Sequence, residues 1–320
     1  MIQNSLFEED TAKYSTIPVN VSKVSQLSPF RYPGGKTWFV PYLRRWLKSL
    51  PKQPRLFVEP FAGGGICSLT CAAEHLADRV YMSELDPDVA SVWQTTLSSD
   101  SEWLINKILN FPRCTKTAAE IFETPPKTTR DRAFQTILRN RLLHGGILAP
   151  GSRMIRSGEN GKGPFSRWYP ETLAKRLKTI YLLRDRIEFE QADAFDVFCR
   201  FRSRKTAAWF VDPPYTASKS NAGRRLYVHH ALDHNRLFDE CSRMAGDFLM
   251  TYDNAIEVEK LAIDRSFIID RVPMKNTHHQ EKYELVISRN SAGCPDLPSS
   301  ERRESARHGP KTAGGGTISS

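Results

Sequence analysis

Residues 209–215 read WFVDPPY, and this stretch decides how the rest of the chain is interpreted. An apolar run typical of a buried strand ends in a carboxylate, two prolines and an aromatic ring. Proline cannot donate a ladder hydrogen bond, so Pro213 and Pro214 predict a stiff loop at the strand end. Open α/β sheets bind ligands at the carboxyl ends of their strands. Asp212, the nearby carbonyls and Tyr215 suit a planar group with an exocyclic amine, such as a nucleobase; an ordinary strand-end turn is the alternative.

A second strand, far upstream, runs into a glycine turn. Residues 55–65 read RLFVEPFAGGG, and the apolar stretch from Ile66 to Ala73 is typical of a helix. Such a turn brings the N–H groups of a helix N-terminus close to a ligand. Ser68 occupies the place of the third small residue of a dinucleotide fingerprint, and no Gly-Lys-Ser/Thr follows. A nicotinamide site and a P-loop are therefore both disfavoured.

Two further segments carry candidate binding residues. Residues 79–86, RVYMSELD, form a strand that ends in acids about 20 residues after the glycines, where an acid binds ribose hydroxyls. Glu84 and Asp86 both remain candidates for that role, and a solvated surface acid is the alternative. Residues 30–36, FRYPGGK, precede an amphipathic helix over 37–50. A lysine beside two glycines could meet a carboxylate, or could be an exposed loop residue.

The order of these motifs resembles the Dam-like DNA N6-adenine methyltransferases. FRYPGGK, EPFAGGG and DPPY follow one another as in that family, and RWYPETL at 167–173 and KYELV at 282–286 extend the resemblance over roughly residues 28–290. It implies S-adenosylmethionine as the cofactor, S-adenosylhomocysteine as the product and no metal. In two places the chain departs from the family: it has ELD at 84–86 where many members have DIN or DLN, and Tyr32 where several have tryptophan.

The resemblance also assigns roles to single residues. It implies that a flipped adenine stacks on Tyr215 while Asp212 and the Pro213 carbonyl accept hydrogen bonds from its N6 amine. Pro214 completes that catalytic motif. Lys36 would neutralise the cofactor carboxylate. The remaining cofactor-binding residues would be Tyr32, Phe61, Gly63, Gly65, Glu84, Asp193 and Asp212.

Seven strands are predicted along the chain. They span residues 56–59, 80–84, 187–192, 207–212, 248–252, 267–272 and 284–288. Helical patterns separate most of them, but none lies between the last two, which predicts a terminal hairpin on a mostly parallel, Rossmann-like methyltransferase sheet. About 100 residues separate the second and third strands, too many for a crossover, so a helical subdomain is inserted there. We therefore divide the chain into an N-terminal extension (1–27), a catalytic domain (28–112 and 187–290), an inserted DNA-recognition subdomain (113–186) and a disordered tail (291–320).

The charge of the chain is concentrated in that insertion. The net charge is +10, and residues 113–190 contain 16 Lys and Arg against 8 Asp and Glu. Basic segments neutralise nucleic-acid phosphates, whereas a merely soluble basic surface would not need to concentrate its charge. Helices are predicted over 130–143 and 172–186, with a loop rich in Gly, Arg and Lys between them. The candidate DNA-binding residues are Arg141, Arg153, Arg156, Lys162 and Arg167.

The remaining features restrict the class of protein. The six cysteines include no Cys-x-x-Cys pair, the opening residues are polar, and no apolar run approaches the ~20 residues that span a bilayer. A cytoplasmic protein is expected, with double-stranded DNA as its partner and, in restriction systems, a cognate endonuclease. The two His-His pairs lack metal-ligand spacing. Transfer to N4 of cytosine, to RNA or to protein glutamine remains an alternative, as does a non-catalytic DNA-binding module.

Overall fold

The computed structural model describes residues 24–31, 35–148, 151–158, 161–214, 232–275 and 281–290. Tyr32 and Tyr215, to which the resemblance assigns roles, lie outside these ranges. So do most of the predicted N-terminal extension and the tail from 291 to 320. In the described part of the chain, no helix is long and apolar enough to cross a membrane.

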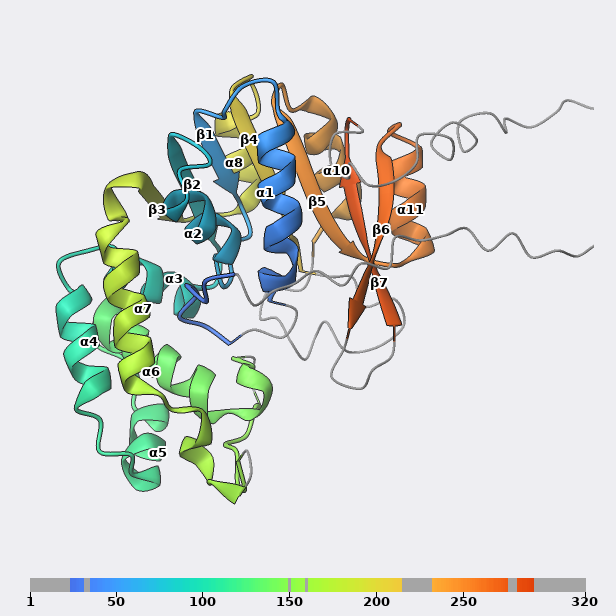
Figure 1. Ribbon diagram of the computed structural model, residues 1–320. Helices are drawn as coiled ribbons and strands as arrows, with labels where there is room; N and C mark the ends of the chain where they lie inside the picture. The colour runs from blue at the N-terminus through green and yellow to red at the C-terminus, as the bar shows by residue number, and fades with distance from the viewer. Residues whose placement is uncertain are drawn as a thin grey trace, which may run out of the picture.

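A single seven-stranded sheet forms the centre of the molecule, with the strand order β3-β2-β1-β4-β5-β7-β6 (Figure 1). Its strands are β1 (Leu56–Glu59), β2 (Arg79–Glu84), β3 (Ile187–Gln191), β4 (Ala207–Val211), β5 (Asp247–Asp253), β6 (Ile268–Lys275) and β7 (Glu281–Ser288). The first five pair in parallel, while β7 lies antiparallel between β5 and β6. The predicted strands and the terminal hairpin are therefore confirmed.

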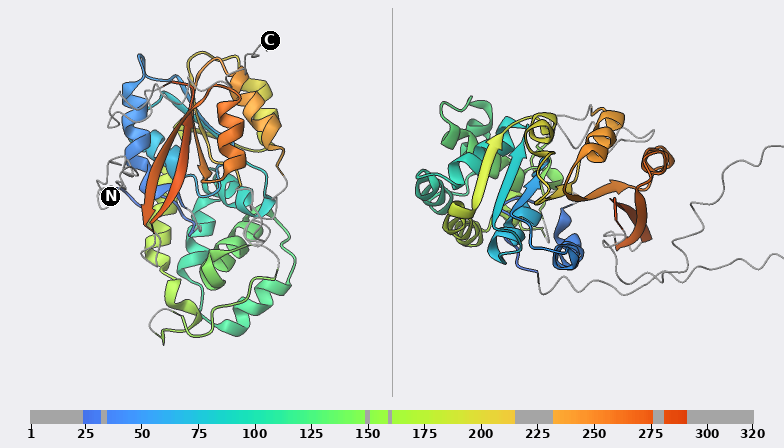
Figure 2. Two further views of the ribbon diagram at one scale, coloured as in Figure 1. Left: turned by 90° about the vertical axis from the view of Figure 1, so that its right-hand side faces the viewer. Right: turned by 90° about the horizontal axis from the view of Figure 1, so that it is seen from above.

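Helices cover both faces of the sheet. They are α1 (Val40–Ser49), α2 (Ile66–Ala73), α3 (Pro87–Thr96), α8 (Ala194–Phe201), α10 (His234–Arg243) and α11 (Ile256–Ile263). Because alternate strand residues face opposite sides, Phe57 and Phe210 pack with α1, α2 and α3 in one core. Val58 and Trp209 pack with α8, α10 and α11 in the other. The view from above in Figure 2 shows these two helical layers.

The insertion between β2 and β3 forms a helical layer of its own (Figure 1). It contains α5 (Thr115–Glu123), α6 (Thr129–Leu142) and α7 (Pro170–Leu182), with 3-10 turns over His144–Gly146, Pro164–Arg167 and Arg184–Arg186. The helix α4 (Ser101–Leu109), which precedes the predicted boundary at residue 113, packs against α7, and α3 packs against α6. The predicted insertion is thus anchored to the preceding part of the chain through both α3 and α4.

The predicted helix over 37–50 is real but begins differently. Residues Lys36–Phe39 form a 3-10 turn, and α1 follows with Pro41 in its first turn. Proline is tolerated there because the first N–H groups of a helix have no intrahelical partner. The turn brings Lys36 to the carboxyl edge of the sheet, where the pocket described below lies.

Candidate active site

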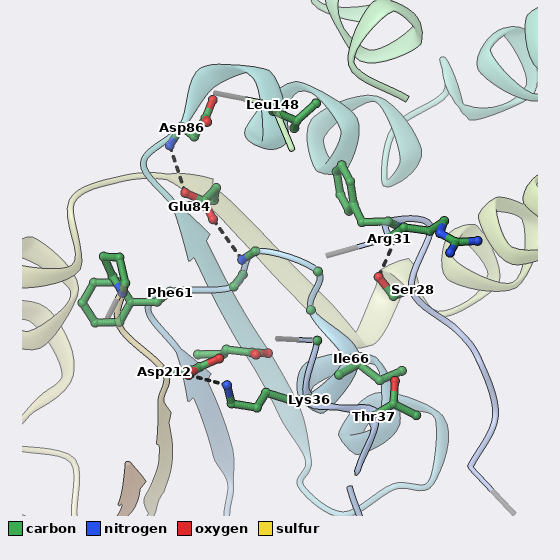
Figure 3. A pocket seen from close by; sticks show the side chains of 18 of the residues that line it. Ser28, Arg31, Lys36, Thr37, Phe61, Ile66, Glu84, Asp86, Leu148 and Asp212 are labelled. Atoms are coloured by element: carbon green, nitrogen blue, oxygen red, sulfur yellow. Dashed lines mark hydrogen bonds and ion pairs between the residues drawn. The ribbon is translucent and has the colours of Figure 1, made fainter. Parts of the chain in front are cut away.

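A pocket of about 630 Å³ lies at the carboxyl ends of β1, β2 and β4. Figure 3 shows the glycine turn at its centre, with Glu84 and Asp86 above it and Lys36 with Asp212 below it. Phe61 lies on one side of the turn, and Arg31 with Ser28 lies on the other. The predicted cofactor-binding residues Phe61, Gly63, Gly65, Glu84 and Asp193 all line this pocket, together with Lys36 and Asp212. The structure therefore brings together residues that are far apart in sequence.

Backbone geometry explains the glycines of the turn. Gly63 and Gly65 have φ of 46° and 60°, in the left-handed region that favours glycine. A Cβ on Gly65 would also lie 2.8 Å from Met82 and 2.9 Å from the Trp93 ring, whereas a Cβ on Gly63 would meet nothing within 4 Å. Trp93 fixes the turn further, because its indole N–H donates to the Gly63 carbonyl at 3.0 Å. The turn therefore lies close against Met82 and Trp93 on one side and leaves room for a ligand on the other.

Backbone N–H groups orient the acids at the strand ends. Glu84 accepts hydrogen bonds from the Gly63 N–H at 2.9 Å and from the Asp86 N–H at 3.0 Å. Burial raises the pKa of Glu84, although these hydrogen bonds oppose the rise. Asp86 caps α3 and Asp193 caps α8, each through its own carboxylate. Glu84 and Asp86 both line the pocket, so both remain candidates for the predicted ribose-binding role.

Asp212 belongs to a buried network of charges. The Lys36 ammonium lies 2.9 Å from its Oδ1 and 3.0 Å from Oε1 of Glu284, and only 6% of the Lys36 side chain is exposed. Burial alone would lower the pKa of Lys36, but the two carboxylates raise it above its ordinary value. The Thr251 hydroxyl also donates to Oδ1 of Asp212, at 2.8 Å. Asp212 is therefore held in one orientation from two sides.

This network departs from the role predicted for Lys36. The sequence predicted that its ammonium would neutralise the cofactor carboxylate, whereas the structure places it between Asp212 and Glu284. Glu284 belongs to the KYELV segment, but no local pattern marks it as a partner of a lysine so far upstream. A lysine already paired with two carboxylates is a poor receptor for a third.

Glu59 is a second buried acid that sequence patterns missed. It ends β1, exposes 3% of its area and accepts a hydrogen bond from the Ser68 N–H at 2.9 Å. Burial raises its pKa to about 8, and the Asp212 carboxylate adds to the rise while Lys36 and the hydrogen bonds from Ser68 oppose it. Burial therefore favours the neutral form of the Glu59 carboxyl group.

The candidate DNA-binding residues divide into two groups. Arg153, Arg156 and Lys162 are exposed, and Arg167 is partly exposed, so they can meet a phosphate backbone. Arg141 is the exception, since it exposes only 5% of its area and its guanidinium donates to the Pro29 carbonyl. The predicted DNA-binding role of Arg141 stays a prediction, and the structure places this buried side chain in the pocket wall.

The pocket includes further residues to which the sequence assigned no role. Ser28, Leu148, Tyr169 and Arg176 line it. Tyr169 is 51% exposed. Tyr169 lies within the RWYPETL segment, and Arg176 lies just after it. Their side chains reach the pocket because α7 packs alongside the catalytic domain, and local periodicity does not encode that arrangement.

The sheet order with its terminal hairpin is that of a Rossmann-like methyltransferase. Residues 32–272 match the family described as D12 class N6 adenine-specific DNA methyltransferase. The chain belongs to this family, which confirms the resemblance read from its motifs. A search of curated proteins gives no match.

Several solved structures are similar to this chain at low identity. The rRNA methyltransferase AviRa from Streptomyces viridochromogenes is 14% identical, with 88% of this chain and 96% of that chain covered and a TM-score of 0.39. A methyltransferase from Geobacter sulfurreducens is 13% identical, with 78% of each chain covered and a TM-score of 0.34. A precorrin-6y C5,15-methyltransferase from Geobacter metallireducens is 10% identical, with 76% and 83% covered and a TM-score of 0.32.

Proposed function

We propose that the protein transfers a methyl group from S-adenosylmethionine to the N6 amine of adenine in double-stranded DNA. The observation that carries the proposal is the position of Asp212. Its carboxylate lies at the end of β4 in the same pocket as Glu84 and Asp193, which suit the cofactor. The family to which the chain belongs supports adenine and DNA as the substrate.

The residues of the pocket fit the cofactor by their chemistry. The glycine turn would allow close approach of a ligand at Gly63, where a Cβ would meet nothing within 4 Å. Glu84 or Asp86 would accept hydrogen bonds from ribose hydroxyls, and Asp193 from the adenine amine of the cofactor. Phe61 and Phe195 would give the adenine ring apolar contacts. S-adenosylmethionine would supply an electrophilic methyl group in this pocket.

The target base would enter from the duplex. Flipping an adenine costs about a few kcal/mol, and stacking on an aromatic ring returns ~1–3 kcal/mol. We propose Tyr215 for that ring, and Tyr169 offers a second ring face at the pocket. The Asp212 carboxylate and the Pro213 carbonyl would accept the two N–H bonds of N6, so the nitrogen lone pair is directed at the methyl carbon.

The transfer is then a direct displacement that depends mainly on positioning. S-adenosylmethionine would supply the methyl group to the N6 lone pair as its S–CH3 bond breaks, which would leave S-adenosylhomocysteine as a neutral thioether. The surplus proton of N6 passes to the Asp212 carboxylate and from there to water. Lys36 and Thr251, which both contact Oδ1 of Asp212, would keep this carboxylate in place during the transfer.

The insertion would bind the DNA. Its exposed Arg153 and Arg156 lie in the loop between α6 and α7. Each phosphate contact contributes about 0.9 to the slope of log affinity against log salt. Replacing both arginines by alanine should weaken DNA binding and reduce that slope by about 1 to 2. Lys205→Ala, at the exposed turn before β4, is the control that should leave the slope unchanged.

Mass spectrometry of nucleosides tests the proposal directly. Duplex DNA modified by the protein should contain N6-methyladenine, and Asp212→Ala should lower the turnover rate by about 10²–10³-fold, as loss of a transition-state contact does elsewhere. The exposed acid Asp196, on α8, is the matched control. Detection of N4-methylcytosine would show a cytosine methyltransferase instead. Methylation only of RNA or of protein glutamine would show an enzyme of that specificity. Retention of DNA binding without cofactor binding would show a non-catalytic module.

A further inference from the structure

Three arginines from separate segments meet at one wall of the pocket. Arg31 precedes the glycines of the FRYPGGK motif, Arg141 ends α6 and Arg176 lies on α7, and all three line the pocket. Arg141 donates to the Pro29 carbonyl, and Arg176 donates to the Ser28 carbonyl at 2.9 Å. We call these three residues the arginine group.

Arg141 and Arg176 bring positive charge to this wall of the pocket. In the described part of the chain both donate to backbone carbonyls and neither pairs with a carboxylate, and Nε of Arg141 is buried without a hydrogen-bond acceptor. Burial lowers the pKa of Arg141 to about 9, and the cations Arg176 and Arg31 lower it further. A buried charge of this kind is costly unless an anion neutralises it.

The other walls of the pocket have the opposite character. Besides the buried Glu59, four acids line it: Glu84, Asp86, Asp193 and Asp212. Lys36 lies beside them but is held between Asp212 and Glu284. An anionic ligand group would be repelled by the acidic walls, so the arginine group is the favourable place for it. A guanidinium also binds a carboxylate with two parallel hydrogen bonds.

We propose that the arginine group binds the α-carboxylate of the cofactor's methionine arm. The proposal rests on S-adenosylmethionine being the cofactor of this pocket, and it assigns the counter-charge to Arg141 and Arg176 in place of Lys36. The sulfonium of the cofactor has three arms, and the pocket has three chemically distinct regions. The acids at the ends of β2 and β3 suit the adenosyl arm, Asp212 faces the transferable methyl group, and the arginine group remains for the carboxylate.

A DNA phosphate is the competing occupant, and burial disfavours it. Arg141 exposes only 5% of its area, so it can be reached from within the pocket but hardly from a duplex surface. A phosphate is attached to the sugar chain on both sides and would need the whole strand to enter. A carboxylate at the end of a flexible arm has no such restriction.

Calorimetry with two ligands tests the proposal on the DNA-free protein. Decarboxylated S-adenosylmethionine is the same molecule without the carboxylate. The wild-type protein should bind S-adenosylmethionine more tightly than this analogue by roughly 10- to 100-fold, because hydrogen bonds to a charged group contribute that much to affinity. Arg141→Met and Arg176→Met should each remove much of that preference, while the affinity for the decarboxylated analogue changes little. Lys175→Met, an exposed charge next to Arg176 on α7, should keep the full preference.

The outcomes separate the proposal from its alternatives. If Arg141→Met weakens both ligands equally, the arginine only supports the loop at residues 28–31, and the proposal is overturned. If it leaves both unchanged but reduces DNA affinity and its salt slope, the group binds phosphate and the proposal is likewise overturned. If the wild-type protein binds neither ligand, the proposed function itself fails. This outcome differs from failure of the arginine proposal, because the wild-type protein then shows no preference for S-adenosylmethionine over the decarboxylated analogue.

Discussion

Replacement of Lys36 by methionine tests whether this lysine serves Asp212 or the cofactor. Methionine keeps the length and the apolar part of the side chain but removes the ammonium that lies 2.9 Å from Asp212 and 3.0 Å from Glu284. Removing one partner of a buried ion pair leaves an uncompensated charge and typically costs 3–5 kcal/mol, so Lys36→Met should lower the free energy of unfolding by about that much. Asp212 and Glu284 would then share a site as like charges, which raises the pKa of one of them.

The same change should act on catalysis more than on cofactor binding. Asp212 loses the contact that orients it, and a misplacement of about 1 Å can cost ~10²-fold in rate. Single-turnover rates should fall by roughly this factor and should recover partly as pH rises, because the coupled carboxyl must be ionised. The affinity for S-adenosylmethionine, measured by calorimetry, should change by less than about threefold.

Two further variants complete the experiment. In Lys36→Met/Glu284→Gln the second buried charge is also removed, so urea unfolding should show a smaller loss of stability than in Lys36→Met. Lys205→Met is the control for loss of an exposed lysine and should be silent. The reasoning is refuted if Lys36→Met retains its stability but loses most of its affinity for S-adenosylmethionine and none for the decarboxylated analogue. That result would return Lys36 to the carboxylate role predicted from sequence.

Two more predictions concern the buried part of the site. Because folding raises the pKa of Glu59 from 4.5 to about 8, the folded state binds an extra proton between these pH values. The contribution of Glu59 to the free energy of unfolding is therefore fully present below pH ~4.5 and is lost as pH rises to about 8, by roughly 3–5 kcal/mol. Urea unfolding of Glu59→Gln across this pH range should lack the pH-dependent component. Identical pH profiles of stability for Glu59→Gln and the wild-type protein would contradict the assignment. Gly65→Ala should lower stability by about 1–3 kcal/mol more than Gly63→Ala, since both have positive φ but only the first also meets Met82 and Trp93. Equal losses for the two glycine variants would show that crowding is not the cause.

The fold could be predicted almost completely from the sequence because its signals are local. Strands such as β1 and β4 are short apolar runs buried on both faces, with turn residues at their ends, and their predicted bounds differ by at most a residue or so from those found. The hairpin followed from the absence of a helical pattern before β7. The helices α3, α4 and α5 were not singled out from the sequence; α4 and α5 pack mainly against α6 and α7, while α3 packs against both α6 and the sheet.

The site could be predicted only in part, because its charges are paired over long distances in sequence. The glycines, Glu84, Asp193 and Asp212 stand at strand ends, and the parallel topology alone brings them to one edge. The pairing of Lys36 with Glu284 depends on where β7 enters the sheet, between β5 and β6. The burial of Arg141 depends on how α6 meets the loop at 28–31. Neither arrangement leaves a trace in composition or periodicity.

That loop connects the insertion to the cofactor pocket. The Asn140 amide accepts from the Arg31 N–H at 2.9 Å and donates to the Arg31 and Gly146 carbonyls at the same distance. Arg141 and Arg176 hold the two residues before Phe30 through their carbonyls. The helices proposed to position DNA therefore also form a wall of the pocket proposed to hold the cofactor. If DNA displaces α6 or α7, it changes that wall, and the linkage is reciprocal: bound cofactor must alter DNA affinity by the same factor by which DNA alters cofactor affinity.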